Sequence, residues 1–138
     1  MAAARAQHVT EIIEPALREG KIIISDRFLD STLAYQGVGR ELGIEAVARL
    51  NISAVNGIEP DLTIYLDIPP QTGLQRKKKN GERLDRLDSQ SQEFYARVYR
   101  GYRTLLSKYS NRIVAVDAEG DIGEIAQVIW EIVEKHLK

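Results

Sequence analysis

Apolar residues recur every three or four positions in four parts of the chain, a spacing that places them along one face of an α-helix. The pattern predicts amphipathic helices over residues 6–17, 44–55, 94–109 and 122–133. Gly20 and Gly57 follow the first two segments and supply helix stop signals. The other two are preceded by capping-box spacings, Ser89 with Gln92 and Asp121 with Glu124.

Prolines modify this helical pattern at two places. Pro15 lies inside the first segment and cannot donate a hydrogen bond to the carbonyl of Glu11, so we expect a kink there. Pro69–Pro70 is typical of a helix start and predicts a further helix that begins at Gln71 and ends near Asn80.

Three short apolar runs lie between the expected helices, at Lys21–Ser25, Leu62–Leu66 and Ile113–Val116. The first is typical of a strand buried on both faces of a parallel sheet. Strands that alternate with helices predict an α/β fold, with three layers in which helices flank a parallel sheet and the crossovers are right-handed. No repeat, low-complexity tract or linker divides the sequence, so we expect a single domain over residues 1–138.

The composition is that of an ordinary globular protein. The 138 residues, 43% hydrophobic and 28% charged, can bury roughly 68% of the surface that the unfolded chain exposes. The absence of cysteine excludes disulfides and thiolate chemistry, and His8 and His136 lie too far apart for a zinc motif. No apolar run approaches about 18 residues and the N-terminus lacks a secretion signal, so we expect a cytoplasmic protein without membrane contact.

The net charge of −1 is unevenly distributed. Residues 76–86 hold six basic and two acidic side chains, a local charge of +4 that leaves −5 for the remainder. This basic segment is either a solvated face or a site for a local anionic partner. It lacks interleaved aromatic residues and the chain is acidic overall, so a nucleic-acid-binding module is the weakest interpretation.

An aspartate follows each of the three expected strands, at Asp26, Asp67 and Asp117. Ligands of open α/β sheets bind at the carboxyl ends of the strands. The pair Asp26–Arg27 is therefore the first candidate site, since it places both charges at that edge. For Asp67 and Asp117, which have no neighbouring arginine, we favour a strand-end ion pair or a turn cap.

Arg5 falls on the apolar stripe of the first expected helix, between the directions of Ile12 and Ala16. Because an unpaired buried charge is costly, this guanidinium needs an internal acceptor or a ligand. An internal salt bridge and an arginine that awaits a polar ligand both fit the sequence.

The segment 28–40 combines aromatic, hydroxyl, amide, glycine and arginine groups directly after the first expected strand. Such a set can stack on a base, bond to a base edge and contact phosphate. The alternative is an irregular surface loop. Gly37 and Gly39 do not form a dinucleotide-binding motif, because the next glycine, Gly43, comes one position too late.

Five stretches together resemble the bacterial thymidylate kinase family, in the family's order and over essentially the whole chain: Ala3–His8, Asp26–Phe28, Ser31–Gly37, Pro60–Asp67 and Leu84–Arg86. The resemblance implies the fold of a P-loop nucleoside monophosphate kinase. It implies phosphoryl transfer from ATP to dTMP, which gives ADP and dTDP. It further implies Mg²⁺ as a cofactor and a homodimer, with no nucleic-acid or membrane partner.

The same resemblance gives roles to residues of the dTMP site. Arg27 resembles the clamp on the dTMP phosphate, a task that suits a planar guanidinium able to grip two oxygens. Asp26 resembles the adjoining carboxylate near the metal and its waters. Arg5 and Gln36 resemble the contacts to the thymine edge, and Tyr35 resembles the residue that packs on the deoxyribose and disfavours a 2′-hydroxyl.

Ser31 and Thr32 would line the same pocket. The basic segment resembles the mobile lid over the ATP phosphates, with Arg76, Lys77, Lys78, Lys79, Arg83 and Arg86 as its cations. In this family a lid of this type carries a catalytic arginine, for which Arg76 and Arg86 are the candidates. Asn80 stands where the family often has arginine, and one residue is added before Leu84.

The chain departs from the family at its beginning. A thymidylate kinase starts with a strand and a phosphate-binding loop of the form G-x-x-x-x-G-K-[ST], whereas the only Gly–Lys pair here, Gly20–Lys21, precedes Ile22. The sequence therefore resembles the C-terminal two-thirds of the enzyme, and we expect it to be inactive alone. Two unpaired apolar strand edges would leave it poorly stable, repacked or associated. A non-catalytic dTMP-binding remnant without an ATP site is the alternative.

Overall fold

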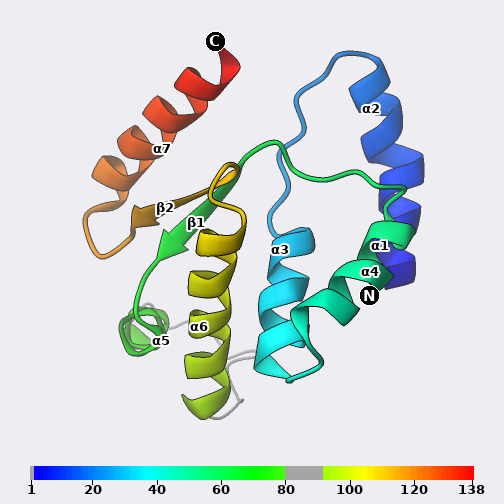
Figure 1. Cartoon of the computed structure of the whole chain (residues 1–138). Helices are drawn as coiled ribbons and strands as arrows, with labels where there is room; N and C mark the ends of the chain where they lie inside the picture. The colour runs from blue at the N-terminus through cyan, green and yellow to red at the C-terminus, as the bar shows by residue number, and fades with distance from the viewer. Residues whose placement is uncertain (1, 80–91) are drawn as a thin grey trace. The chain divides into compact units, whose positions relative to one another are not determined.

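The computed structural model describes residues 2–79 and 92–138. Contacts along the chain divide it into two compact units, Met1–Pro60 and Asp61–Lys138, which are described separately below. Figure 1 gives the labels of the helices and strands used here. The single domain expected from the sequence stays a prediction.

The first expected helix is present as three consecutive helical segments: α1 (Ala2–His8), the π-helical turn η1 (Val9–Ile13) and α2 (Glu14–Arg18). The kink expected at Pro15 stays a prediction. Ahead of Pro15 the helix has a π-turn, in which the backbone N–H of Glu14 bonds to Val9 O. Pro15 has no N–H to donate, and the change of bonding register from α to π lies directly before it. Gly20, with φ of +74°, ends the helix as expected.

The strand expected at Lys21–Ser25 is wrong. These residues have an irregular conformation, and Ile22 and Ile24 are 69% and 94% exposed. A strand exists only where a neighbour completes its backbone hydrogen bonds, and among residues 2–79 and 92–138 no strand pairs with this segment. Asp26–Arg27 is therefore placed by a bend and not by the end of a strand.

Residues 28–40 are not a surface loop. They form α3 (Leu29–Thr32) and the π-helix η2 (Leu33–Gly39), and Leu29, Leu33 and Ala34 are buried. The predicted helix that follows is α4 (Ile44–Ala54). A Cβ at Gly37 would lie 3.2 Å from the Cα of Ile44, so a glycine lets the backbones of η2 and α4 approach closely.

The core of the first unit joins the N-terminal helix to the start of α3. Val9, Ile13, Leu29 and Val55 form a buried cluster, and partly buried Phe28 packs against it. Burial of each such side chain contributes about 1.5–3 kcal/mol, and Phe28 and Leu29 thereby fix the backbone that follows Arg27.

The second unit is built on two parallel strands, β1 (Thr63–Asp67) and β2 (Ile113–Asp117), whose register pairs Thr63 with Ile113 and Asp67 with Asp117. Its helices are α5 (Pro70–Lys79), α6 (Gln92–Lys108) and α7 (Ile122–Leu137), and α6 and α7 flank the strands (Figure 1). The α/β class and the parallel sheet are confirmed. The described residues hold two strands of the three expected.

The second core lies between β1, β2 and α6, where the aromatic ring of Tyr65 stacks on Tyr102 at 4.7 Å. Asp121 caps α7 as expected, because its Oδ1 accepts from the N–H of Gly123 at 2.8 Å. Ser89 of the other capping prediction lies outside the described residues. No helix in the described part of the chain is both long and apolar enough to span a membrane.

Candidate functional site

Arg5, on α1, is held by two neutral acceptors in the first unit. Its Nη1 donates to Asn51 Oδ1 at 2.6 Å and its Nη2 to Thr32 Oγ1 at 2.7 Å. The guanidinium also lies 5.8 Å from the centre of the Phe28 ring, and its partial burial lowers the pKa of Arg5. Neither acceptor is a carboxylate, so neither bond is the internal salt bridge considered from the sequence. A guanidinium has five N–H groups, and these two bonds use two of them.

Gln36 lies on η2, four residues after Thr32, so the two side chains share one side of the helical segment. Within the residues that the structure describes, the buried Oε1 of Gln36 has no hydrogen-bond partner. A buried acceptor without a donor costs about 1–3 kcal/mol, so a native protein keeps one mainly where a donor arrives from elsewhere. The unsatisfied oxygen of Gln36 thus lies on the same side of the helical segment as Thr32, whose hydroxyl accepts a hydrogen bond from Arg5.

Arg27 and Tyr35 come together at the second predicted part of the site. The guanidinium of Arg27 lies 5.6 Å from the centre of the Tyr35 ring, and Ser25 Oγ donates to Arg27 O at 3.1 Å. Arg27 has φ of +64°, a left-handed conformation that costs a non-glycine residue about 1–3 kcal/mol. Strained residues of this kind gather at functional sites, and both Asp26 and Arg27 are exposed to solvent.

Asn51, a buried residue of α4, is a site residue that was not predicted from the sequence. Its signal was present, because Asn51 stands on the apolar stripe of α4 as Arg5 does on that of α1. Each is a polar side chain on an apolar helix face, and the two are joined by the hydrogen bond from Arg5 Nη1 to Asn51 Oδ1. Ser31, predicted to line the same pocket, is half-buried on α3 directly before Thr32.

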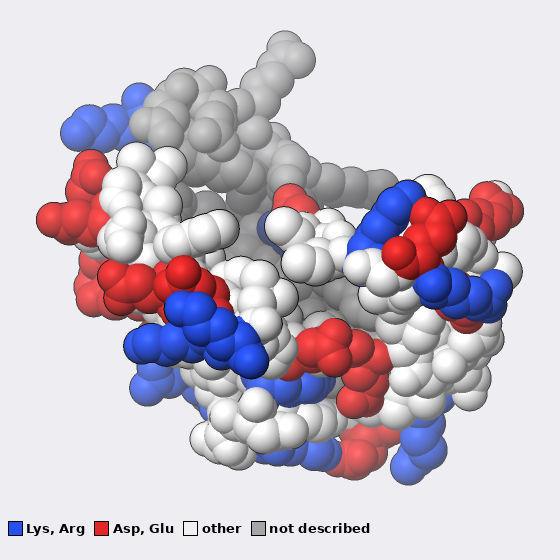
Figure 2. Space-filling view, turned by 90° about the horizontal axis from the view of Figure 1, so that it is seen from above, with Lys and Arg blue, Asp and Glu red and all other residues white. Residues whose placement is uncertain are grey.

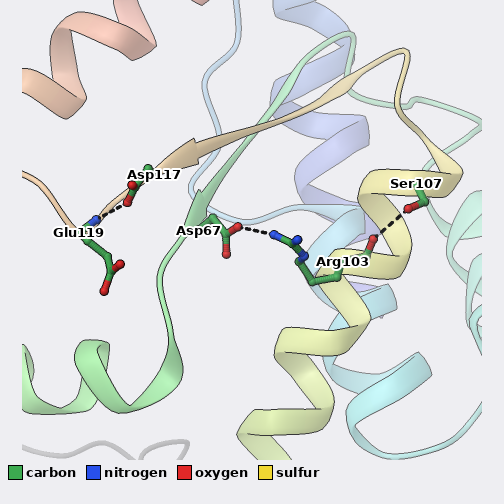
Figure 3. Close-up of polar contacts among 5 residues, drawn as sticks. All are labelled: Asp67, Arg103, Ser107, Asp117 and Glu119. Atoms are coloured by element: carbon green, nitrogen blue, oxygen red, sulfur yellow. Dashed lines mark hydrogen bonds and ion pairs between the residues drawn. The ribbon is translucent and has the colours of Figure 1, made fainter.

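In the second unit, Asp67 and Asp117 lie at the same edge of the sheet, at the ends of β1 and β2. Asp67 Oδ2 pairs with Arg103 Nη1 at 2.6 Å, and Asp117 Oδ1 accepts from the N–H of Glu119 at 2.8 Å (Figure 3). The strand-end ion pair and the turn cap favoured for these residues are both confirmed. Burial, and then the charge of Asp67, raise the pKa of the neighbouring Tyr65.

The basic segment is described only in its first part. Arg76, on α5, donates from Nη1 to Ala118 O at 2.6 Å and from Nη2 to Glu119 O, so it holds the turn after β2. Lys79 is exposed at the end of α5. Lys77 and Lys78 belong to α5 with side chains outside the described part, and Arg83 and Arg86 lie wholly outside it. On the face that Figure 2 shows, basic and acidic side chains are interspersed, and the described residues of that face form no single large basic patch.

The described residues contain no group of three or more histidine, aspartate or glutamate side chains that could hold a metal ion. Asp26 contributes a single exposed carboxylate on its bend. A Mg²⁺ ion that binds together with a nucleotide needs few protein ligands, because phosphates and water fill the other positions. One carboxylate fits that role and does not fit a metal cage made of protein alone.

Comparison with known proteins gives a consistent result over nearly the whole chain. The family model described as thymidylate kinase matches residues 1–129. A thymidylate kinase of Synechococcus sp. (strain JA-2-3B'a(2-13)) is 46% identical over 136 residues, which cover 99% of this chain and 64% of that protein. That of Limosilactobacillus fermentum is 49% identical over 132 residues, 95% of this chain and 60% of the relative.

The thymidylate kinase of Anoxybacillus flavithermus is 46% identical over 138 residues, 99% of this chain and 66% of the relative. The chain thus spans less than two-thirds of the length of these curated relatives. Within that length, the family model and the relatives agree on one family. The chain belongs to the thymidylate kinase family.

Proposed function

We propose that this chain carries the dTMP-binding part of a kinase that transfers a phosphoryl group from ATP to dTMP and so forms dTDP. The observation that carries the proposal is the unsatisfied Oε1 of Gln36 on the same side of a helical segment as the hydroxyl that anchors Arg5. An unpaired amide oxygen and an arginine with unused N–H groups are side chains that can read the edge of a base. Family membership supports the reaction, and these contacts support the choice of residues for the site.

Thymine matches this arrangement by its hydrogen-bonding pattern. Its N3–H is a donor and the adjacent O4 is an acceptor, so Gln36 Oε1 accepts from N3 while a remaining N–H of Arg5 donates to O4. Cytosine has the reverse pattern, with an acceptor at N3 and a donor at N4. Thr32 and Ser31 line the pocket, and Tyr35 packs on the deoxyribose.

Arg27 grips the phosphate of dTMP in this proposal. Its exposed guanidinium is free to form two parallel bonds to phosphate oxygens, and the ring of Tyr35 holds it close to the sugar. The acceptor phosphate is already a competent nucleophile, so these residues align it and reduce charge repulsion and need not remove a proton. The stored strain at Arg27 is consistent with a residue kept for binding.

ATP and Mg²⁺ complete the reaction. Asp26 would hold Mg²⁺ through a water molecule, and the metal would supply charge neutralisation for the phosphates of ATP. Arg76, Lys77, Lys78, Lys79, Arg83 and Arg86 form the lid over those phosphates, with Arg76 or Arg86 on the transferred group. For that role Arg76 exchanges its bonds to the 118–119 carbonyls for phosphate oxygens. The whole enzyme acts as a cytoplasmic homodimer.

A second candidate function is dTMP binding without catalysis by this chain alone. This candidate is favoured by the structure around Gly20–Lys21, the only Gly–Lys pair in the sequence. Gly20 ends a helix, and the Lys21 ammonium forms an ion pair with Glu19 at 2.5 Å. That pair is not a phosphate-binding loop. Calorimetry with ATP and a coupled assay of dTDP formation separate the two candidates.

The test of the base site is titration calorimetry of the chain with dTMP and with dCMP. Because dCMP leaves both Gln36 and the O4 donor of Arg5 unpaired, we expect it to bind at least about 30-fold more weakly. Gln36→Leu removes the acceptor, and this discrimination falls with it. Gln7→Ala is the matched control, since Gln7 is exposed and bonds only along its own helix to Glu11. Equal binding of the two nucleotides contradicts the proposal.

A further inference from the structure

Asn51 is an amide on the buried face of α4, only 6% exposed. Burial of an amide is costly unless both of its ends are bonded. Both ends of Asn51 are bonded, because its Nδ2 donates to Val47 O at 2.7 Å and its Oδ1 accepts from Arg5 Nη1 at 2.6 Å. The residue therefore joins the body of one helix to a charged side chain of another.

The bond to Val47 settles which end of the amide faces Arg5. With Nδ2 held by the carbonyl one turn earlier in α4, the planar amide directs its oxygen to the guanidinium. Thr32, the other anchor, is a hydroxyl on a different element, α3. Arg5 is thus fixed from two directions, at Nη1 by α4 and at Nη2 by α3.

An arginine side chain otherwise occupies many rotamers, and a ligand that needs it in one position must order it on binding. A site that is ordered in advance binds more tightly, because that entropy is lost during folding and not during association. The anchors on Nη1 and Nη2 hold the plane of the guanidinium and leave its three other N–H groups at fixed positions.

We propose that Asn51 is a positioning residue of the dTMP site, which presets the Arg5 guanidinium toward the thymine edge without touching the nucleotide. This inference rests on the proposed function, since it needs Arg5 to contact the base. In this inference, thymine is selected by residues of two helices. Arg5 of α1 contacts the base, and Asn51 of α4 orients the Arg5 guanidinium.

Asn51→Leu tests the proposal with little change in volume. The backbone N–H of residue 51 still bonds Val47 O in α4, so the variant leaves no unpaired carbonyl on the helix. We expect its Kd for dTMP to rise about tenfold, and the ratio of the dCMP and dTMP constants to fall. Asn51→Asp keeps an acceptor for Arg5 and restores the Kd to within about threefold. Ser53→Ala, an exposed change on α4, leaves the Kd unchanged.

A double-mutant cycle with Arg5→Met separates positioning from packing. In the Arg5→Met background, Asn51→Leu changes the Kd for dTMP less than about twofold, because there is no guanidinium left to aim. Additive effects, an unchanged Kd in Asn51→Leu, or a loss that Asn51→Asp does not restore overturns the inference while the proposed function stands. If the unsubstituted chain does not bind dTMP, the proposed function fails and this inference fails with it. If Asn51→Leu does not fold, Asn51→Ala, which also lacks the acceptor for Arg5, takes its place in the cycle.

Discussion

Gly37→Ala places a methyl group where η2 and α4 approach most closely. The added Cβ lies 3.2 Å from the Cα and 3.4 Å from the backbone N of Ile44, and both neighbours are backbone atoms that cannot rotate away. Overpacking of this kind costs about 1–3 kcal/mol, against a gain of about 0.4–1 kcal/mol from the less flexible unfolded chain. The net expectation is a loss of about 1–2 kcal/mol in the free energy of unfolding.

The assay is a thermal melt followed by circular dichroism, in which that loss lowers Tm by about 3–8 °C. Gly73→Ala is the matched control, because the nearest atom to its Cβ is the side chain of Ile68 at 4.0 Å, and alanine is the better helix former in α5. The two substitutions are chemically identical and should change Tm in opposite directions. A Gly37→Ala protein as stable as the unsubstituted chain would refute the close approach of η2 and α4, and with it the placement of Gln36.

Three further predictions concern strain, alkaline pH and capping. Arg27→Gly relieves the left-handed conformation, so we expect urea unfolding to show a free energy of unfolding higher by about 0.5–1 kcal/mol. The same variant lacks the guanidinium, so its Kd for dTMP, measured by calorimetry, rises about 10- to 100-fold. A variant that binds dTMP with an unchanged Kd contradicts the role of Arg27 at the phosphate. Burial raises the pKa of Tyr65 above its ordinary value of 10.0, so the unfolded chain loses this proton first and stability falls as pH rises above about 10. In melts at a series of pH values, Tyr65→Phe removes the part of the decrease in stability above pH ~10 that the ionisation of Tyr65 causes. An unchanged dependence of Tm on pH in this variant contradicts the prediction. Asp121→Ala removes the cap of α7 and costs about 1 kcal/mol in urea, whereas a cost near zero would show that the bond to Gly123 does not stabilise the helix.

Local patterns predicted the helices and the sheet edge well. The periodicity of residues 44–55 corresponds to α4, and Asp67 and Asp117 lie side by side as the ends of parallel strands must. The helix depends on residues close together in the sequence, and the sheet edge depends on the pairing of β1 with β2, which are both among the described residues. The turn cap at Asp117 and the ion pair of Asp67 follow for the same reason.

The errors come from interactions that no local pattern contains. Lys21–Ser25 has the composition of a strand and no partner among the described residues, so its isoleucines remain exposed. Segment 33–39 has no simple period because a π-helix has neither 3.6 nor two residues per turn. Asn51 was overlooked because its meaning depends on Arg5, 46 residues away in the sequence.

The central claim is that Gln36 and Arg5 read a pyrimidine whose phosphate Arg27 holds. A crystal structure of the chain with dTMP measures it directly. We expect Gln36 Oε1 and the thymine N3 to lie about 2.9 Å apart, an Arg5 nitrogen equally close to O4, and the Arg27 guanidinium on the phosphate. A nucleotide bound elsewhere, with Gln36 Oε1 still unpaired, would contradict the account.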